Sequence, residues 1–295
     1  MTAPGSRVAT LVAAVLAALS VGVAAQVPVS RPRITGIDHI VLRASDAAAA
    51  KRFYGDMLAL LETTRAADKG AAGRLRFQVG ERQWILVDPD LPAGEDERLP
   101  LLAFATPDLE QLAAHLTAQG IAVTRGDGAF RVADPDGHPL AFVQRAWPRD
   151  GSFGEVTHAP QPISTRILHA GLTVRDEAAA NRFYKDILGF GEIWRGGRSE
   201  GTTDWINMRV PDGTDYLEYM LVSSPPDRRQ RGVLHHVALL VPDIQAAWDA
   251  AGARTPAADR ARLGPPNVGR NGRWQLNLYD GDGTRTELME PFTVR

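Results

Sequence analysis

The chain has 295 residues, of which 44% are hydrophobic, and its net charge at pH 7 is −2. That length suits two domains of ordinary size, and the near-neutral charge argues against nucleic acid as a partner. Cysteine is absent, which excludes disulfides and thiolate chemistry. Any metal ion would therefore have to be held by His, Asp or Glu side chains.

The N-terminus has the pattern of a secretory signal. Arg7 precedes an apolar, Ala-rich run at Val8–Ala25, which ends in small residues ahead of "QVPVSRPR". We expect a signal peptide at residues 1–25, cut near Ala25–Gln26, and export of the protein to the periplasm or the medium. An uncleaved anchor is the alternative, since the run approaches the length that spans a bilayer. The small residues at its end favour cleavage, and after cleavage we expect no stable insertion of the protein into a membrane.

Two halves follow, predicted at 34–147 and 165–291, with a Pro-, Gly- and Ser-containing linker at 148–164 between them. Each half contains two segments that read as a strand leading into a helix: "GIDHIVLRAS" and "LPLLAFATPD", then "RILHAGLTVRD" and "GVLHHVALLVPD". An aspartate stands at each expected helix start, where it suits an N-cap. These residues are Asp46, Asp108, Asp176 and Asp243.

Two or three β-rich segments follow each helix, for example "RLRFQV", "YLEYMLV" and "TRTELME", with turns such as "PDG" and "GDG" between them. The pattern is strand–helix–strands, repeated four times, and it predicts an α+β fold. One such module leaves an apolar sheet face uncovered. Two modules side by side bury that face and leave a cleft, so four modules give two clefts.

The halves are an internal repeat, which defines the folding unit. "AKRFYGDMLAL" returns as "ANRFYKDILGF", and "DHIVLRASD" is matched by "HAGLTVRD". The same offset of 130 positions separates 53 from 183, 39 from 169 and 46 from 176. The repeat therefore allows the residues of the two clefts to be compared position by position.

The second half carries one His and one Glu in each of its modules. Spacings of 49, 18 and 51 residues separate the four, in the order His169, Glu218, His236 and Glu287. His236 precedes Asp243 by the seven residues that separate His169 from Asp176. His235 is out of this register and should point to the opposite face of its strand.

This set predicts a metal site. A carboxylate within "YLEYMLV" is costly to bury alone, and a strand histidine by itself is more often a packed core residue than a ligand. Four such residues in register across two modules favour a divalent cation instead. Imidazole and carboxylate together suit one ion of Zn, Ni, Fe, Mn or Co.

The first half provides a comparison. Its matching positions are taken as His39, Gln83, Leu101 and Ala141. These offer one imidazole and one amide but no carboxylate, which cannot hold a divalent ion firmly. We therefore predict that the first half lacks a metal site and that His39 is a packed strand residue.

These motifs, with "FYGDML", "DPDGHPLAFV" and "LYDGDGTRTELME", resemble the vicinal oxygen chelate superfamily over nearly the whole mature chain. That superfamily includes glyoxalase I, bleomycin-resistance proteins and extradiol dioxygenases. The resemblance implies four βαβββ modules, paired into two domains with a curved half-barrel sheet around each cleft. It also implies a metal site at His169, Glu218, His236 and Glu287.

The His-Glu-His-Glu set is similar to glyoxalase I, which implies a lyase or isomerase acting on a small substrate through adjacent oxygens. The metal would stabilise an enediolate, and Glu287 or Glu218 would be the catalytic base. The alternative is an extradiol-type ring-cleaving dioxygenase, for which His169, His236 and Glu287 would form the triad. Such enzymes have a catalytic His where this chain has Glu218. A third possibility is a non-enzymatic small-molecule binding or resistance protein, whose clefts lack the ligand set.

Two loops remain. "GPPNVGRNGRW" carries Arg270, Arg273 and Trp274 and either closes over an anionic or aromatic ligand or is a solvated loop. "SSPPDRRQRG" reads as the connector between the last two modules. The expected partner is a small-molecule substrate, and the chain is expected to be a monomer or a homodimer.

Overall fold

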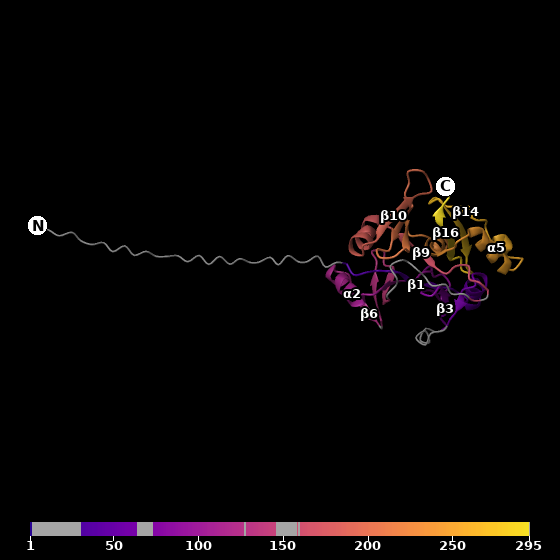
Figure 1. Cartoon of the computed structure of the whole chain (residues 1–295), viewed down its shortest axis with the longest axis horizontal. Coiled ribbons are helices and arrows are strands. Elements are labelled where there is room, and N and C mark those ends of the chain that lie inside the picture. Colours follow the sequence, from indigo (N-terminus) through magenta and orange to yellow (C-terminus); the bar gives the residue numbers. More distant parts are fainter. Residues whose placement is uncertain (2–30, 64–72, 127, 146–157, 159, 295) are drawn as a thin grey trace. The chain divides into compact units, whose positions relative to one another are not determined.

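A computed structural model of the protein describes residues 1, 31–63, 73–126, 128–145, 158 and 160–294 (Figure 1). Residues 2–25 of the predicted signal peptide and most of the predicted linker at 148–164 lie outside this part of the chain. Both therefore stay predictions, as do the domain boundaries. No helix among the described residues is long and apolar enough to cross a membrane.

The first half forms an eight-stranded sheet with the order β2-β3-β4-β1-β5-β8-β7-β6. Its first module consists of β1 (Gly36–Arg43), α1 (Ala47–Ala50), the π-helix η1 (Lys51–Met57), β2 (Leu61–Glu62), β3 (Leu75–Val79) and β4 (Gln83–Asp88). Its second module consists of β5 (Leu101–Thr106), α2 (Leu109–Ala118), β6 (Thr124–Gly126), β7 (Ala129–Ala133) and β8 (Pro139–Gln144). The modules join where β1 and β5 pair antiparallel.

The second half repeats this arrangement, in the order β10-β11-β12-β9-β13-β16-β15-β14. Its first module consists of β9 (Ile167–Val174), α3 (Glu177–Ala180), the π-helix η3 (Asn181–Ile187), β10 (Gly191–Gly196), β11 (Trp205–Arg209) and β12 (Tyr216–Leu221). After the connecting helix α4 (Arg228–Leu234) come β13 (His236–Leu240), α5 (Ile244–Arg254), the 3-10 helix η4 (Arg260–Arg262), β14 (Asn267–Val268), β15 (Arg273–Tyr279) and β16 (Arg285–Thr293). Antiparallel pairing of β13 with β9 joins the modules. The predicted α+β fold with four paired modules is confirmed.

Three of the four predicted N-cap aspartates accept a hydrogen bond from the backbone N–H three residues later. They are Asp46, Asp176 and Asp243. Asp108 is also the N-cap residue of its helix, α2, as predicted, but its side chain makes no capping hydrogen bond. There Gln144 Oε1 accepts from the Leu109 N–H at 3.1 Å, so a side chain from β8 satisfies an N–H that the helix leaves free.

The repeated "RFY" motif places an aromatic pair in each π-helix, and the tyrosines reach across to the other half. Tyr54 Oη donates to Asp280 Oδ2 at 3.1 Å, and Tyr184 Oη donates to Asp134 Oδ2 at 2.9 Å. Each aspartate stands directly before a turn tripeptide, Asp280 before "GDG" and Asp134 before "PDG". The first module therefore packs against the fourth, and the second against the third, in a reciprocal arrangement.

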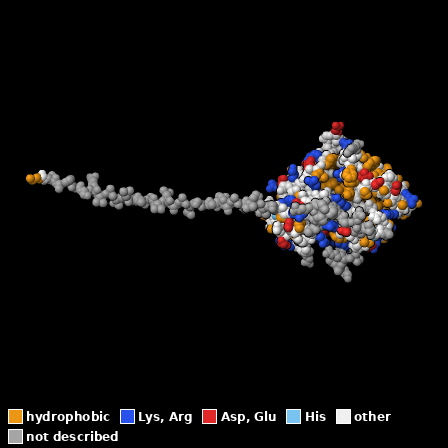
Figure 2. Space-filling model, viewed as in Figure 1, with side chains coloured by type: hydrophobic (Ala, Val, Ile, Leu, Met, Phe, Trp, Pro, Cys, Tyr) orange, Lys and Arg blue, Asp and Glu red, His pale blue; other side chains and the backbone are white. Residues whose placement is uncertain are grey.

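One cluster of buried apolar side chains runs through both sheets. Phe104 of the first half and Phe190 of the second meet edge to face within it, with ring centroids 5.5 Å apart. On the surface, acidic and basic side chains are interspersed over the face that Figure 2 shows, which fits the near-neutral net charge. The shared core holds the two halves together and so fixes the cleft residues of each.

Candidate metal centre

The centre of the second sheet brings the four predicted ligands onto one face. Gly171 of β9 is paired with Glu218 on β12 and with His236 on β13. His169 lies two residues before Gly171 and so shares its face of the strand. Glu287 of β16 is paired with Ala238, two residues beyond His236. Four neighbouring strands thus contribute one ligand each.

The ligand atoms of these four side chains all lie within 4.8 Å of one another. His169 Nε2 and His236 Nε2 are 3.1 Å apart. Glu287 Oε2 is 3.5 Å from both nitrogens. Glu218 Oε2 is 3.4 Å from His236 Nε2 and 3.9 Å from His169 Nε2. The structure therefore brings together every site residue that the sequence predicted.

These spacings fit a divalent ion. Ligand atoms that sit about 2.1 Å from a metal and at right angles to one another are roughly 3.0 Å apart. The measured separations of 3.1, 3.4 and 3.5 Å lie close to this value. Two imidazoles and two carboxylates also form the donor set that Zn, Ni, Fe, Mn or Co accepts. The cluster can therefore hold one such ion.

Both histidines are held in place by their surroundings. The ring of His169 stacks on Tyr216, with centroids 4.5 Å apart and planes at 26°. His236 Nδ1 donates to the Leu234 carbonyl at 3.0 Å, which leaves Nε2 with the lone pair that a metal needs. Both rings are fully buried. The imidazoles are thus oriented before any ion binds.

Arg285, which the sequence analysis missed, lies against the His236 ring. Its Nη2 is 2.8 Å from Nδ1 and 2.9 Å from Nε2, and nearly equal distances place the guanidinium over the ring face. It is also 4.0 Å from Glu218 Oε2. Arg285 precedes Glu287 by two residues on β16, so strand alternation was a signal that could have found it.

Burial and neighbouring charges set the protonation of the centre. Burial lowers the pKa of His236 well below its ordinary value, and the neighbouring Arg285 and His169 side chains lower it further. Burial by itself would raise the pKa of Glu287, but the hydrogen bond from His169 and the charge of Arg285 outweigh it, so this pKa is lowered. A neutral imidazole and a charged carboxylate are the forms that bind a metal.

Gly171 is required by the close approach of His236. A Cβ built at this position would lie 2.0 Å from His236 Cε1 and 2.1 Å from its Nδ1. Any side chain there would displace the ring. The sequence carries a signal for this that was missed, because a glycine inside a strand such as "HAGLTV" often marks such a close approach.

A cavity of about 490 Å³ opens over the cluster and includes Glu218 and Glu287 in its lining. Trp194 and Trp205 contribute aromatic walls, and the arginines that face it are Arg198, Arg270 and Arg285. Asn267 to Asn271 of the predicted loop also border the cavity. Arg273 and Trp274 of that loop do not line the cavity. Of the three loop residues singled out in the sequence, only Arg270 does so.

The first half has an apolar cluster at the equivalent place, and one predicted correspondence is wrong. His39 is paired with Trp84, as His169 is with Tyr216, so Leu86 and not Gln83 matches Glu218. Leu86 packs with Val41, Leu101, Ala103 and Ala141. His39 Nδ1 lies 2.7 Å from Asp38 Oδ1. Among the described residues, the second half holds the one cluster with metal-ligand composition.

Gln83 instead joins the two halves. Its Oε1 accepts from the Ile167 N–H at 2.7 Å, and its Nε2 donates to the Ile167 carbonyl at 3.2 Å. Its counterpart in the second half is Asp215, which accepts from the Ile37 N–H at 2.9 Å. A polar side chain at the start of β4 therefore serves the interface between the halves, because the strand register places it outside the cleft.

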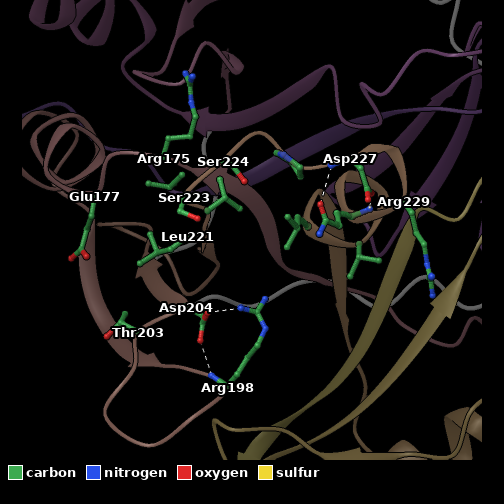
Figure 3. A pocket seen from close by; sticks show the side chains of 16 residues that line it. Arg175, Glu177, Arg198, Thr203, Asp204, Leu221, Ser223, Ser224, Asp227 and Arg229 are labelled. Carbon is green, nitrogen blue, oxygen red and sulfur yellow. Dashed lines mark hydrogen bonds and ion pairs between the residues drawn. The ribbon is translucent and has the colours of Figure 1, made fainter.

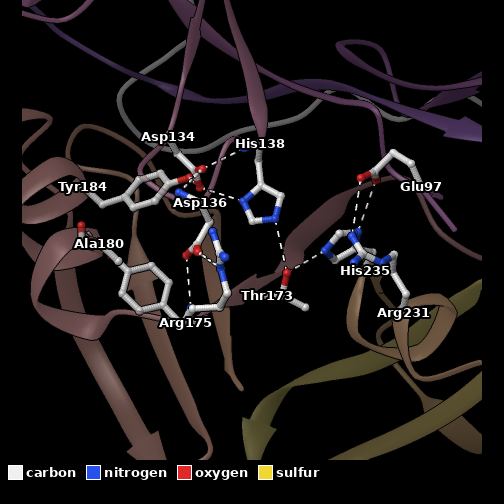
Figure 4. A network of polar contacts seen from close by, with 11 residues as sticks. Glu97, Asp134, Asp136, His138, Thr173, Arg175, Ala180, Tyr184, Arg231 and His235 are labelled. Atoms are coloured by element: carbon white, nitrogen blue, oxygen red, sulfur yellow. Dashed lines mark hydrogen bonds and ion pairs between the residues drawn. The ribbon is translucent and has the colours of Figure 1, made fainter. Parts of the chain in front are cut away.

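His235 points away from the cluster, as predicted, into a buried polar network (Figure 4). Its Nε2 is 3.0 Å from Thr173 Oγ1, and its Nδ1 is 3.3 Å from Glu97 Oε1. Thr173 Oγ1 is in turn 3.3 Å from His138 Nε2. This network crosses from the second half to the first next to the candidate ligand His236.

The chain matches the model of the Glyoxalase/Bleomycin resistance protein/Dioxygenase superfamily at residues 36–142 and 166–288. The chain belongs to this superfamily. The resemblance expected from the sequence is thus confirmed, and each superfamily repeat coincides with one of the two sheets. Among curated proteins, an uncharacterized Bacillus subtilis protein, YwbC, is 29% identical over 86 residues, which are 29% of this chain and 68% of YwbC.

Solved structures share the fold of most of the chain. The 2,3-dioxygenase LapB from Pseudomonas sp. KL28 is similar with a TM-score of 0.64 and 18% identity, covering 88% of this chain and 93% of LapB. A variant of homoprotocatechuate 2,3-dioxygenase from Brevibacterium fuscum is similar with a TM-score of 0.61 and 22% identity, covering 88% and 72%. At these identities the likeness establishes the shared fold.

Proposed function

We propose that the chain is a metal-dependent enzyme that binds a small substrate through two adjacent oxygen atoms. The observation that carries this proposal is the buried cluster of His169, Glu218, His236 and Glu287 at the floor of a cavity of about 490 Å³. One divalent ion would be held by these four residues. When bound, such an ion supplies a Lewis acid for the substrate oxygens and, if it is iron, a centre for O₂ chemistry.

Ring cleavage of a catechol by O₂ is the first candidate reaction. Its support is that the similar solved structures include 2,3-dioxygenases, one described as an extradiol ring-cleaving dioxygenase. His169, His236 and Glu287 supply the two-histidine, one-carboxylate set of non-haem iron oxygenases. The side chains of these three are at most 4% exposed, whereas the Glu218 side chain is 12% exposed and lies farther from His169. Glu218 then faces the substrate, and its carboxylate accepts a proton from a catechol hydroxyl.

An isomerase or lyase of the glyoxalase type is the second candidate. The observation that favours it is the carboxylate of Glu218, whose Oε2 is as close to His236 Nε2, at 3.4 Å, as that of Glu287 is at 3.5 Å. As a fourth ligand Glu218 would fill a position that a dioxygenase keeps open for substrate or O₂. Either Glu218 or Glu287 would then move a proton between adjacent carbons of an α-hydroxycarbonyl compound.

The cavity favours a substrate with an aromatic or anionic part. Trp194 and Trp205 offer ring faces, and Arg198, Arg270 and Arg285 offer positive charge. Arg198 lies over the Trp205 ring, 5.4 Å from its centroid, and Arg270 Nε donates to the Gly197 carbonyl at 3.0 Å. Arg198 is also ion-paired with Asp204, whereas the Nε contact of Arg270 leaves its two Nη groups to orient a carboxylate.

The test compares Glu218→Gln and Glu218→His with the wild type after loading with Fe(II), Mn(II), Zn(II) or Ni(II). Oxygen uptake with catechols and proton exchange on α-hydroxycarbonyl compounds are measured beside metal content. Glu192→Gln, at an exposed glutamate outside the cavity, is the matched control.

Catechol-dependent oxygen uptake by the Fe(II) or Mn(II) wild type, kept or raised in Glu218→His, supports ring cleavage. Proton exchange without oxygen uptake, lowered roughly 10²-fold in Glu218→Gln together with metal content, supports the isomerase or lyase. A fully metal-loaded protein with neither activity contradicts both candidates and favours a binding protein.

A further inference from the structure

A second cavity, of about 530 Å³, lies beside α4 and is lined largely by arginine. Its polar lining residues are Arg98, Arg228, Arg229, Tyr279 and Asp282. It shares with the metal cavity only Val233 of α4. None of the candidate metal ligands lines it, and nothing in the proposed reaction uses it.

Arg98 forms the buried part of this cavity. It comes from the loop between β4 and β5 of the first half, and its side chain is 2% exposed. Among the described residues, neither its Nε nor its Nη1 has a hydrogen-bond partner. An unpaired buried donor costs free energy, and a charged one costs more. A guanidinium held in this state is therefore a strong binding group for an anion.

The one carboxylate in the cavity does not neutralise Arg98. Asp282 Oδ1 is 3.9 Å from Arg98 Nη1, beyond hydrogen-bond distance. Its Oδ2 accepts a hydrogen bond from the Ser45 N–H at 2.7 Å, so this carboxylate is committed to the contact between the halves. Asp282 thus leaves the donors of Arg98 free to bind a ligand.

Arg228 and Arg229 add two positive charges from α4. No ion pair is found for either of them within the described part of the chain. The neighbouring carboxylate, Asp227, accepts from the Gln230 N–H at 2.7 Å as the N-cap of α4, and it does not line this cavity. Arg229 also borders a larger neighbouring cavity, on the far side from Arg198 and Asp204 (Figure 3). Three arginines therefore face a single aspartate.

We propose that this arginine cavity is a binding site for a small oxyanion, such as phosphate, sulfate or a carboxylate. Planar guanidinium groups bind the oxygens of these anions through paired, charge-assisted hydrogen bonds. Arg98 would contact the anion from the buried side, and Arg228 and Arg229 from the solvent side. The site is distinct from the metal centre and does not depend on the proposed reaction.

Inorganic phosphate, titrated calorimetrically into the metal-loaded full chain and again after chelation of the metal, tests the proposal. Saturable binding should persist after chelation. Arg98→Met should weaken it at least about 10-fold, as should Arg229→Ala, because each removes a charge-assisted contact. Arg131→Ala, at an exposed arginine of β7 that lines neither cavity, is the matched control and should bind phosphate like the wild type. Competition by sulfate and by acetate then distinguishes a tetrahedral oxyanion from a carboxylate as the preferred ligand.

Arg98→Met removes an unpaired buried charge and keeps a side chain of similar length, so it should fold at least as stably as the wild type in phosphate-free buffer. Arg229 is exposed, so Arg229→Ala should fold normally. It tests the site even if Arg98→Met does not fold. The proposal is overturned if phosphate binds Arg98→Met and Arg229→Ala as tightly as the wild type. It is equally overturned if binding disappears with the metal or in Arg131→Ala, or if no binding is measurable at about 10 mM phosphate, where a site with millimolar affinity would be largely filled.

Discussion

The glycine in the middle of β9 should control metal binding without touching the ion. In a Gly171→Ala variant the new methyl would lie 2.0 Å from His236 Cε1, whereas carbon atoms in contact are about 3.5–4.0 Å apart. The imidazole must therefore retreat by about 1.5 Å. Metal–ligand bonds tolerate only about 0.2 Å, so His236 would no longer reach an ion held by the other three ligands.

We expect the metal affinity of Gly171→Ala to fall roughly 100-fold, the upper range for disturbing the support of a ligand. Titration calorimetry with Zn(II) or Mn(II) measures this directly. Gly191→Ala is the matched control, because it is also a strand glycine but its Cβ would meet nothing within 4 Å. It should bind metal like the wild type.

A second variant separates the steric effect from misfolding. In Gly171→Ala combined with His236→Ala the clash with the ring is gone, so the thermal stability of the metal-free protein should recover while metal binding stays lost. A folded Gly171→Ala protein with wild-type metal affinity would refute the reasoning, since the ring would then have room that the structure does not show.

Four further outcomes are expected. Elemental analysis should find one divalent ion per chain and almost none in His236→Ala; two ions per wild-type chain would contradict a metal-free first half. Burial raises the pKa of Asp280 from 3.8 to about 6, so the folded state holds this proton more tightly than the unfolded state. The protonated Asp280 then contributes about 3 kcal/mol to the free energy of unfolding below about pH 4, and this contribution is lost as the pH rises to about 6. In denaturant unfolding, the Asp280→Asn variant should not show this decline in stability. Tyr54→Phe should lower the unfolding free energy by about 1–2 kcal/mol, because it removes a buried hydrogen bond between the halves, and an unchanged midpoint would show that the bond contributes nothing. We also propose export: the mature protein should begin near Gln26, and a membrane-embedded chain with an intact Met1 would contradict it.

The metal cluster could be predicted from the sequence because one strand register, repeated, sets both histidines, and the two glutamates follow them at similar spacings of 49 and 51 residues. His169 and His236 hold the same spacing to an N-cap aspartate, and that aspartate fixes where each strand ends and its helix begins. The start of a helix is marked by local sequence, so it can be recognised without knowing which strands pair. Strand alternation then sufficed to separate His236 from His235, which the structure places in the buried network.

The match of Gln83 to Glu218 failed because it depended on a pairing between strands that is not local. In "RQWILVD" the polar residue that invites comparison with a glutamate is Gln83, but β4 is set against β1 so that Leu86 takes that place. A sequence alone does not show which residue of one strand lies opposite another. The contact of Arg285 with His236 depends on the pairing of β13 with β16 and is hidden in the same way, although strand alternation from Glu287 indicates which face of β16 Arg285 occupies.

The apolar counterpart of the metal cluster has a consequence for redesign. His39 already stands where His169 does, and its neighbours Leu86, Leu101 and Ala141 occupy the places of the other three ligands. Replacing these three residues by Glu, His and Glu, respectively, would still not create a metal site. Val41 stands where Gly171 does, and the Val41 side chain would occupy the space of the new imidazole. Four substitutions are therefore the smallest set. Since they would place two carboxylates in an apolar environment, folding of that half would become conditional on supplied metal.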